Sequence, residues 1–158
     1  MERVSIGFFG CRNVGKSSLV NRITNQDMSV VSSVKGTTTD PVRKTMELLP
    51  IGPVVIIDTP GFDDEGEIGE KRIEQTKKIL RSCDIAVLVT EAGRDFTLVE
   101  DGLIGIFKER EIPYIIVKNK VDSIDEKVEN GGNVVYTSAA DNIGIEELKN
   151  AIGGLTRK

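Results

Sequence analysis

The chain has 158 residues, a length that suits one compact domain, and we expect residues 1–158 to form a single domain with one sizeable core. Its formal net charge of −4 argues against broad nonspecific binding to nucleic acid. It has no histidine and only two cysteines, Cys11 and Cys83, which excludes a Ser-His triad and a Cys/His zinc site. The first residues run straight into an apolar strand, without a leader or membrane span, so a cytoplasmic location is the expectation.

Strand-like and helix-like patterns alternate along the chain. Apolar runs predict buried strands at 4–9, 54–57, 85–89, 114–117 and 134–136, and an alternating pattern predicts a half-exposed strand at 45–48. Helical spacing predicts helices at 16–23, 70–80, 101–111 and 145–152, and the charged residues of the second are expected to face solvent. This order predicts an α/β fold: a doubly wound, mostly parallel six-stranded sheet with one antiparallel edge strand and helices on both faces. A ligand is then expected at the carboxyl ends of the strands.

Residues 10–17 read Gly-Cys-Arg-Asn-Val-Gly-Lys-Ser and match G-x-x-x-x-G-K-S, the pattern of a phosphate-binding loop. In this segment, named the phosphate loop below, Gly10 and Gly15 are expected to take backbone angles that other residues avoid, so that amides curl around an anion. Lys16 is expected to reach the β- and γ-phosphates, and the Ser17 hydroxyl to ligate Mg²⁺, at the start of the next helix. The nucleotide-binding residues predicted here are Arg12, Asn13, Val14, Gly15, Lys16, Ser17 and Ser18.

The segment Asp58-Thr59-Pro60-Gly61 follows the strand at 54–57, where P-loop enzymes keep the aspartate on the Mg²⁺ side of the site. Asp58 is expected to hold the metal through a water, and the Gly61 amide to bond the γ-phosphate. The same four residues also make a good turn, so it is their place after the phosphate loop that favours the metal site.

The segment Asn119-Lys120-Val121-Asp122 follows the strand at 114–117 and predicts a guanine site. The Asp122 carboxylate can accept from both N1–H and the N2 amino group of guanine, whereas adenine would leave it unpaired. Asn119 is expected to brace neighbouring loops, and the Lys120 stem to cover the ring face. After the last strand, Ser138 and Ala139 are expected to complete the nucleotide site, with the Ala139 amide facing guanine O6. These motifs in this order favour GTP over ATP.

The set of motifs resembles the P-loop GTPases of the TrmE–Era–EngA–septin-like group. Asn13 in the phosphate loop, the sequence Gly-Thr-Thr-Thr-Asp at 36–40 and Phe62 after Gly61 carry the resemblance. It implies the P-loop GTPase fold and Mg²⁺-dependent hydrolysis of GTP to GDP and phosphate. By the same resemblance, Thr38 would ligate Mg²⁺ in the GTP state, Asn13 would help to hold a stimulating K⁺ ion, and the catalytic residues would be Lys16, Thr38, Gly61 and Asn13.

Phe62 stands where small signalling GTPases place a glutamine that orients the attacking water. A phenylalanine side chain has no hydrogen-bonding group, so we expect slow intrinsic turnover unless another group positions the water. Asp63, Asp64 and Glu65 are candidates for that role. The segments 25–40 and 62–69 are expected to be the switches that γ-phosphate and Mg²⁺ order.

Several further segments resemble the GTPase domain of the FeFe-hydrogenase maturation family HydF, namely Thr37–Val42, Met46-Glu47, Pro50–Val54 and Asp63–Gly66. The resemblance implies GTP and GDP as ligands and other hydrogenase maturation proteins as partners of the full-length protein, with no membrane or nucleic-acid partner and an isolated domain that is a monomer or weak dimer. Two alternatives stay open: an RNA- or ribosome-associated GTPase of the Era or EngA type, and a nucleotide-gated interaction module that scarcely hydrolyses GTP.

Overall fold

The computed structural model describes residues 3–24, 41–63, 66, 68–124 and 130–156. Six strands form one sheet in the order β2-β3-β1-β4-β5-β6, in which β2 is antiparallel to β3 and every other pair is parallel. The strands are β1 (Val4–Gly10), β2 (Val42–Leu48), β3 (Gly52–Asp58), β4 (Ile85–Glu91), β5 (Tyr114–Asn119) and β6 (Val134–Tyr136). The helices are α1 (Lys16–Thr24), α2 (Glu70–Leu80), α3 (Leu98–Glu109) and α4 (Ile145–Thr156). The predicted doubly wound sheet with one antiparallel edge strand is confirmed.

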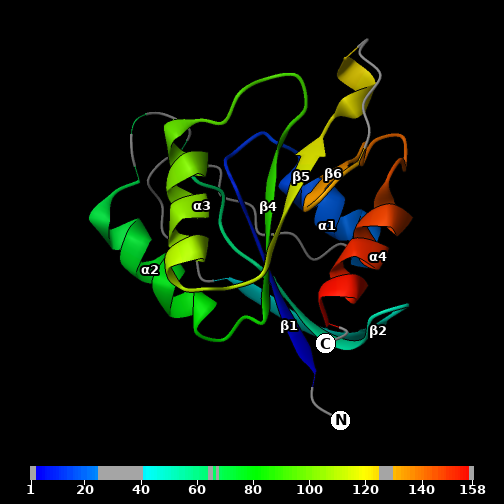
Figure 1. Ribbon diagram of the computed structural model, residues 1–158, viewed down its shortest axis with the longest axis horizontal. Helices are drawn as coiled ribbons and strands as arrows, with labels where there is room; N and C mark the ends of the chain where they lie inside the picture. Colours follow the sequence, from blue (N-terminus) through cyan, green and yellow to red (C-terminus); the bar gives the residue numbers. More distant parts are fainter. Residues whose placement is uncertain (1–2, 25–40, 64–65, 67, 125–129, 157–158) are drawn as a thin grey trace.

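The helices cover both faces of the sheet, with α2 and α3 on one side and α1 and α4 on the other (Figure 1). Between them, β1 and β4 are the central strands, and β4 is buried along its length except at Glu91. Continuous apolar strands of this kind need cover on both faces. On the α3 side, Phe9 of β1 packs against Phe107 with ring centroids 5.4 Å apart.

The helix α3 begins at Leu98, whereas the apolar spacing predicted a start at 101. The reason is a capping box in which the Thr97 hydroxyl accepts from the Glu100 amide at 3.1 Å and the Glu100 carboxylate accepts from the Thr97 amide at 2.9 Å. The pair satisfies two backbone groups at the helix start and fixes where the helix begins. The spacing of apolar residues alone does not carry that information.

The charged helix α2 does not expose all of its charges, which corrects the expectation of a purely solvated face. Arg72 is half-buried: its guanidinium lies 3.9 Å from the centre of the Phe62 ring and donates to the Pro60 carbonyl at 3.2 Å. Burial lowers the pKa of Arg72, an effect that nearby Asp63 opposes. This side chain therefore joins α2 to the segment that follows β3.

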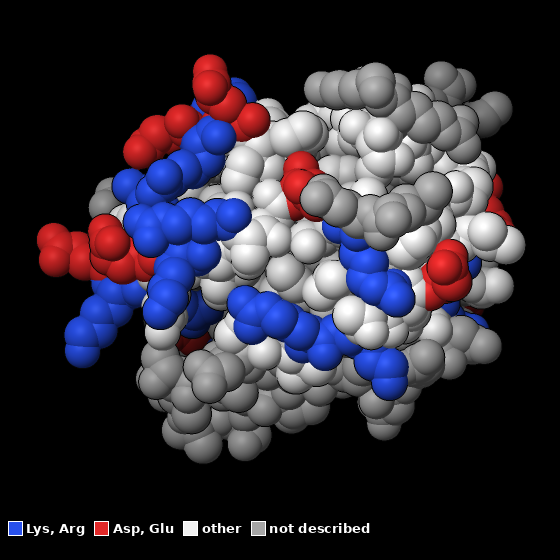
Figure 2. All heavy atoms as spheres, turned by 90° about the horizontal axis from the view of Figure 1, so that it is seen from below, with Lys and Arg blue, Asp and Glu red and all other residues white. Residues whose placement is uncertain are grey.

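The parallel strands all end at the same edge of the sheet, which places the ends of β1, β3, β5 and β6 together. The opposite end, seen from below in Figure 2, carries many Lys and Arg side chains, with Asp and Glu side chains among them. Among the described residues, no helix is long and apolar enough to cross a membrane.

Candidate functional site

The phosphate loop connects β1 to α1 through two residues with positive φ, Asn13 at 68° and Gly15 at 85°. A Cβ at Gly15 would also collide with the side-chain amide of Asn119. The expectation for Gly10 is corrected, because this residue ends β1 and has no such angle. Gly10 is needed for another reason: a Cβ there would lie 2.7 Å from the carbonyl oxygen of Val89 on the neighbouring strand.

Lys16 and Asp58 form a buried ion pair at the start of α1. The ammonium also donates to the Thr59 carbonyl at 2.5 Å, so the Lys16 side chain reaches the end of β3. Burial lowers the pKa of Lys16, and the attraction of Asp58 opposes that shift. The pair places a cation and a carboxylate together beside the half-buried Ser17.

The segment after β3 is tied to the phosphate loop by backbone hydrogen bonds. The Phe62 amide donates to the Gly10 carbonyl at 3.0 Å, and the Arg12 amide donates to the Phe62 carbonyl at 2.8 Å. The Thr59 hydroxyl donates to the Phe8 carbonyl at 2.7 Å and is therefore turned toward the sheet. Gly61 lies against Arg12, where a Cβ would meet the Arg12 Cγ at 3.2 Å. The Gly61 amide is thus held next to the phosphate loop.

The predicted water-orienting position is filled by a core residue, because Phe62 is only 3% exposed. Of the acidic candidates that follow it, Asp63 forms an ion pair with Arg12 at 3.2 Å. Asp64, Glu65 and Thr38 lie outside the described residues, as do 25–40 of the first predicted switch and parts of the second.

Asn119 joins the three predicted binding segments. Its amide nitrogen donates to the Val14 carbonyl at 3.0 Å, while its oxygen accepts from the Thr137 hydroxyl at 2.9 Å and the Ala139 amide at 3.1 Å. All of these groups are buried. The Ala139 amide, expected to face guanine O6, therefore has a partner within the protein.

The remaining predicted residues lie around this junction. Lys120 has a φ of 63°, and its ammonium donates to the Asn13 carbonyl at 2.5 Å. Asp122 lies in the turn Val121–Ser123 after β5 with its side chain exposed, and Ser138 is fully buried. The Arg22 guanidinium of α1 donates to the Ala139 carbonyl at 2.8 Å, which ties the loop after β6 to the helix that follows the phosphate loop. Ser18 lies exposed on α1.

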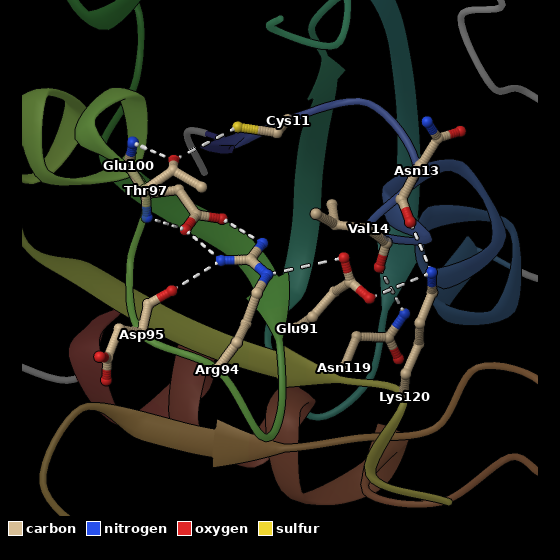
Figure 3. A network of polar contacts seen from close by, with 10 residues as sticks. All are labelled: Cys11, Asn13, Val14, Glu91, Arg94, Asp95, Thr97, Glu100, Asn119 and Lys120. Atoms are coloured by element: carbon tan, nitrogen blue, oxygen red, sulfur yellow. Dashed lines mark hydrogen bonds and ion pairs between the residues drawn. The ribbon is translucent and has the colours of Figure 1, made fainter. Parts of the chain in front are cut away.

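Sequence reasoning missed a set of charged residues beside the site, shown in Figure 3. Glu91 ends β4 and lies 3.4 Å from the Lys120 ammonium, and Arg94 binds the buried Glu100 carboxylate through two hydrogen bonds of 2.8 and 3.0 Å. The Thr-x-x-Glu pattern at 97–100 was the available signal, because it is typical of a capping box. Nothing in the sequence signals the role of Glu91, since its partner lies far along the chain.

The sequence matches the family model for the 50S ribosome-binding GTPase over residues 5–120. It is 33% identical over 162 residues to the tRNA modification GTPase MnmE of Thermoanaerobacter sp. (strain X514), an alignment that covers 98% of this chain and 35% of that protein. It is also 39% identical over 124 residues to the GTPase Der of Campylobacter fetus subsp. fetus (strain 82-40), covering 77% of this chain and 27% of Der. The chain thus spans about a third or less of the length of these relatives.

The fold is also similar to solved structures. A variant of Aquifex aeolicus Era bound to GDP.AlF4- superposes with a TM-score of 0.77 at 23% identity, over 98% of this chain and 57% of Era. The G domain of the T. maritima FeoB iron transporter superposes with a TM-score of 0.68 at 23% identity, over 99% of this chain and all of that domain. At this level of identity the likeness concerns the fold alone.

Proposed function

The chain belongs to the 50S ribosome-binding GTPase family and is a P-loop GTPase domain of the TrmE/Era/Der type, and we propose that it hydrolyses GTP at the edge where β1, β3, β5 and β6 end. The observation that carries this proposal is the Asn119 side chain, which binds both Val14 in the phosphate loop and Ala139 after β6. Through it, the segments predicted for phosphate and for base are held as one unit.

The phosphates would lie along the phosphate loop, within reach of Lys16 and the amides at the start of α1. Ser17 and Asp58 offer a hydroxyl and a carboxylate, the oxygen ligands that suit Mg²⁺, and the ion pair with Lys16 holds the Asp58 carboxylate at the start of α1. By the sequence resemblance, the Thr38 hydroxyl would add a third oxygen ligand. When bound, Mg²⁺ would neutralise charge on the β- and γ-phosphates. Lys16 and the Gly61 amide would stabilise the charge that builds up on the transferring phosphoryl group.

Guanine would be read by Asp122, whose exposed carboxylate can turn toward a base, while the Lys120 stem lies over the ring. Binding at O6 would require the Ala139 amide to share its hydrogen between the base and Asn119 Oδ1. The test is titration calorimetry with GDP and ADP. We expect GDP binding and no measurable ADP binding. Asp122→Asn should weaken GDP binding and admit XDP, whereas Asp101→Asn, an exposed change on α3, should leave both unchanged. Equal binding of GDP and ADP would overturn the assignment.

For hydrolysis, we propose that K⁺ supplies the charge that an arginine finger supplies in other GTPases, because Phe62 offers no group that could orient the water. Asn13 is exposed in the phosphate loop, and its side-chain amide points away from the contacts that Lys120 makes (Figure 3). An amide oxygen with neighbouring carbonyl oxygens is a neutral donor set that suits a large monovalent cation. Asn13 would then hold the ion, whereas Lys16 would bind the phosphates directly.

The finer identity that we propose is the GTPase domain of a HydF-type hydrogenase maturation factor, supported by the sequence segments named above. The partners would then be other maturation proteins. A domain exchange tests this: the chain replaces the GTPase domain of a HydF protein in a cell-free hydrogenase maturation assay. We expect the exchanged protein to support maturation and its Lys16→Ala variant to fail. An inactive exchange with intact GTP turnover would reject the HydF assignment and retain the GTPase.

An RNA-associated role is the second candidate, and the many Lys and Arg side chains at the amino ends of the strands favour it, with Asp and Glu side chains among them (Figure 2). This face lies opposite the proposed nucleotide site. Binding of structured RNA at low and at raised salt, roughly 50 and 200 mM, distinguishes the two roles, because phosphate contacts weaken steeply with salt. We expect no binding at either concentration if the HydF-type role is correct.

A further inference from the structure

Lys120 bridges two loops that come from distant parts of the chain. Its ammonium lies between the Asn13 carbonyl oxygen, at 2.5 Å, and the Glu91 carboxylate, at 3.4 Å. Asn13 belongs to the phosphate loop, Lys120 follows β5, and Glu91 ends β4, as Figure 3 shows. The neutral carbonyl alone would be a weak holder for a long, flexible side chain. The charge that fixes the ammonium is that of Glu91.

Glu91 is itself held by a rigid neighbour. Arg94 lies 3.6 Å from Glu91, donates to the Asp95 carbonyl at 2.9 Å and makes the paired hydrogen bonds to Glu100. Glu100 is fully buried and is locked in the capping box of α3. A guanidinium bound through a planar fork has little freedom to move. The Glu91 carboxylate therefore stands between two cations, one of which the start of α3 keeps in place.

The same contacts return to the phosphate loop at a second point. The Thr97 hydroxyl, which caps α3, lies 3.8 Å from the Sγ of Cys11. The network thus touches the phosphate loop at Cys11 and at Asn13, while Lys120 belongs to the segment proposed to read the base. Removing a charge from its middle should disturb the base contact without opening the core.

We propose that Glu91, supported by Arg94 and Glu100, is a positioning residue for guanine nucleotides: it holds the Lys120 ammonium on the Asn13 carbonyl and so keeps the Lys120 stem in place against the base. This inference rests on the proposed function, because it assigns a role within the same site. Without Glu91, Lys120 samples more rotamers, and ordering it on binding costs entropy. The nucleotide then leaves faster.

The test measures the rate at which a fluorescent GDP analogue leaves the protein after a chase with excess GDP. Since the side chains of Glu91 and Lys120 are 34% and 41% exposed, we expect Glu91→Gln to speed release about 2- to 5-fold. The release rate of Glu91→Asp, which keeps the charge, should lie between the rates of the parent and of Glu91→Gln. In a Lys120→Met background, Glu91→Gln should change the rate no further, because the group through which it acts is gone.

The matched control is Glu109→Gln at the last residue of α3, which removes the same charge from an exposed ion pair with Lys77 of α2 and should leave release unchanged. If Glu91→Gln releases the nucleotide at the same rate as the control, the inference is overturned. GDP binding by the parent would still uphold the proposed function in that case. If Glu91→Gln speeds release equally in the parent and in the Lys120→Met background, the inference is also overturned, because Glu91 would then act without Lys120. Failure of the parent to bind GDP would overturn both.

Discussion

The guanidinium of Arg72 lies 3.9 Å from the centre of the Phe62 ring, which joins the first turns of α2 to the segment after β3. Phe62 is buried in the core cluster, and its backbone pairs with the phosphate loop through Gly10 and Arg12. The position at which other GTPases orient water is therefore structural in this protein. A movement of Phe62 would therefore disturb its contacts with both α2 and the phosphate loop.

Phe62→Gln should not restore a glutamine-dependent reaction. The amide would replace a buried ring and lose its packing, so we expect the free energy of unfolding to fall by about 3 kcal/mol. The GTP turnover should stay at or below that of the parent. Urea denaturation and phosphate release measure the two effects, with Ile143→Gln at an exposed apolar site as the control. A faster, stably folded Phe62→Gln variant would contradict the structural role.

Gly15→Ala should abolish tight GDP binding, because the new Cβ meets both a positive φ and the Asn119 amide. The collision would displace Asn119 from Val14 and Ala139 and separate the two parts of the proposed site. Gly105→Ala, in a helix position with open space around it, is the matched control and should bind GDP normally. Calorimetry on both variants decides the point, and near-parental affinity of Gly15→Ala would refute it.

Asn13→Ala should lose the difference between K⁺ and Na⁺ in GTP turnover. An arginine finger accelerates related reactions about 10³- to 10⁵-fold, and a cation without directed hydrogen bonds should contribute less. The assay compares phosphate release in equal concentrations of KCl and NaCl, with the exposed α3 variant Asp101→Asn as the control. Equal rates in both salts for the parent would reject the cation and leave Asp63, Asp64 and Glu65 as candidates.

Cys83 should resist alkylation in the folded protein. Burial raises the pKa of its thiol to about 12, so under mildly alkaline conditions the thiolate is scarce. We expect iodoacetamide to modify Cys83 roughly 10³-fold more slowly than the same thiol in urea, where its pKa is about 8.5. Mass spectrometry over time gives both rates. Rapid modification without denaturant would show that the packing of Cys83 against the core opens readily.

The Glu100 carboxylate should make stability depend on acidity. Burial would raise its pKa, but hydrogen bonds from Arg94 and Thr97 outweigh burial and lower it. A depressed folded-state pKa contributes stability above the unfolded value of about 4.3 and loses it as the pH falls through the folded value. Thermal melts between about pH 7 and pH 3 should therefore show a smaller acid-dependent drop for Glu100→Gln than for the exposed control Glu111→Gln. Parallel curves would show that the pKa of Glu100 is the same in the folded and the unfolded protein.

The sheet and the edge that carries the site could be inferred from the sequence alone. Alternating apolar strands and amphipathic helices allow few connections, and parallel strands bring their ends to one edge, so the phosphate loop, Asp58 and Asn119 could be placed together without coordinates. The positive φ of Gly15 could also be predicted, because the phosphate-loop motif requires this backbone angle.

The long-range contacts, by contrast, emerge only from the packed structure. Position 10 requires a glycine because a side chain there would collide with the Val89 carbonyl, and Arg72 is half-buried because it packs on the Phe62 ring. Glu91 at the end of β4 contacts Lys120, which follows the neighbouring strand β5. The two residues of each pair are too far apart in the sequence for a helix or strand period to predict their contact. Each contact depends on how the strands and helices pack. The ion pair of Lys16 with Asp58 and the shared Asn119 side chain are of the same kind: the residues were predictable, whereas their partners depend on three-dimensional distance.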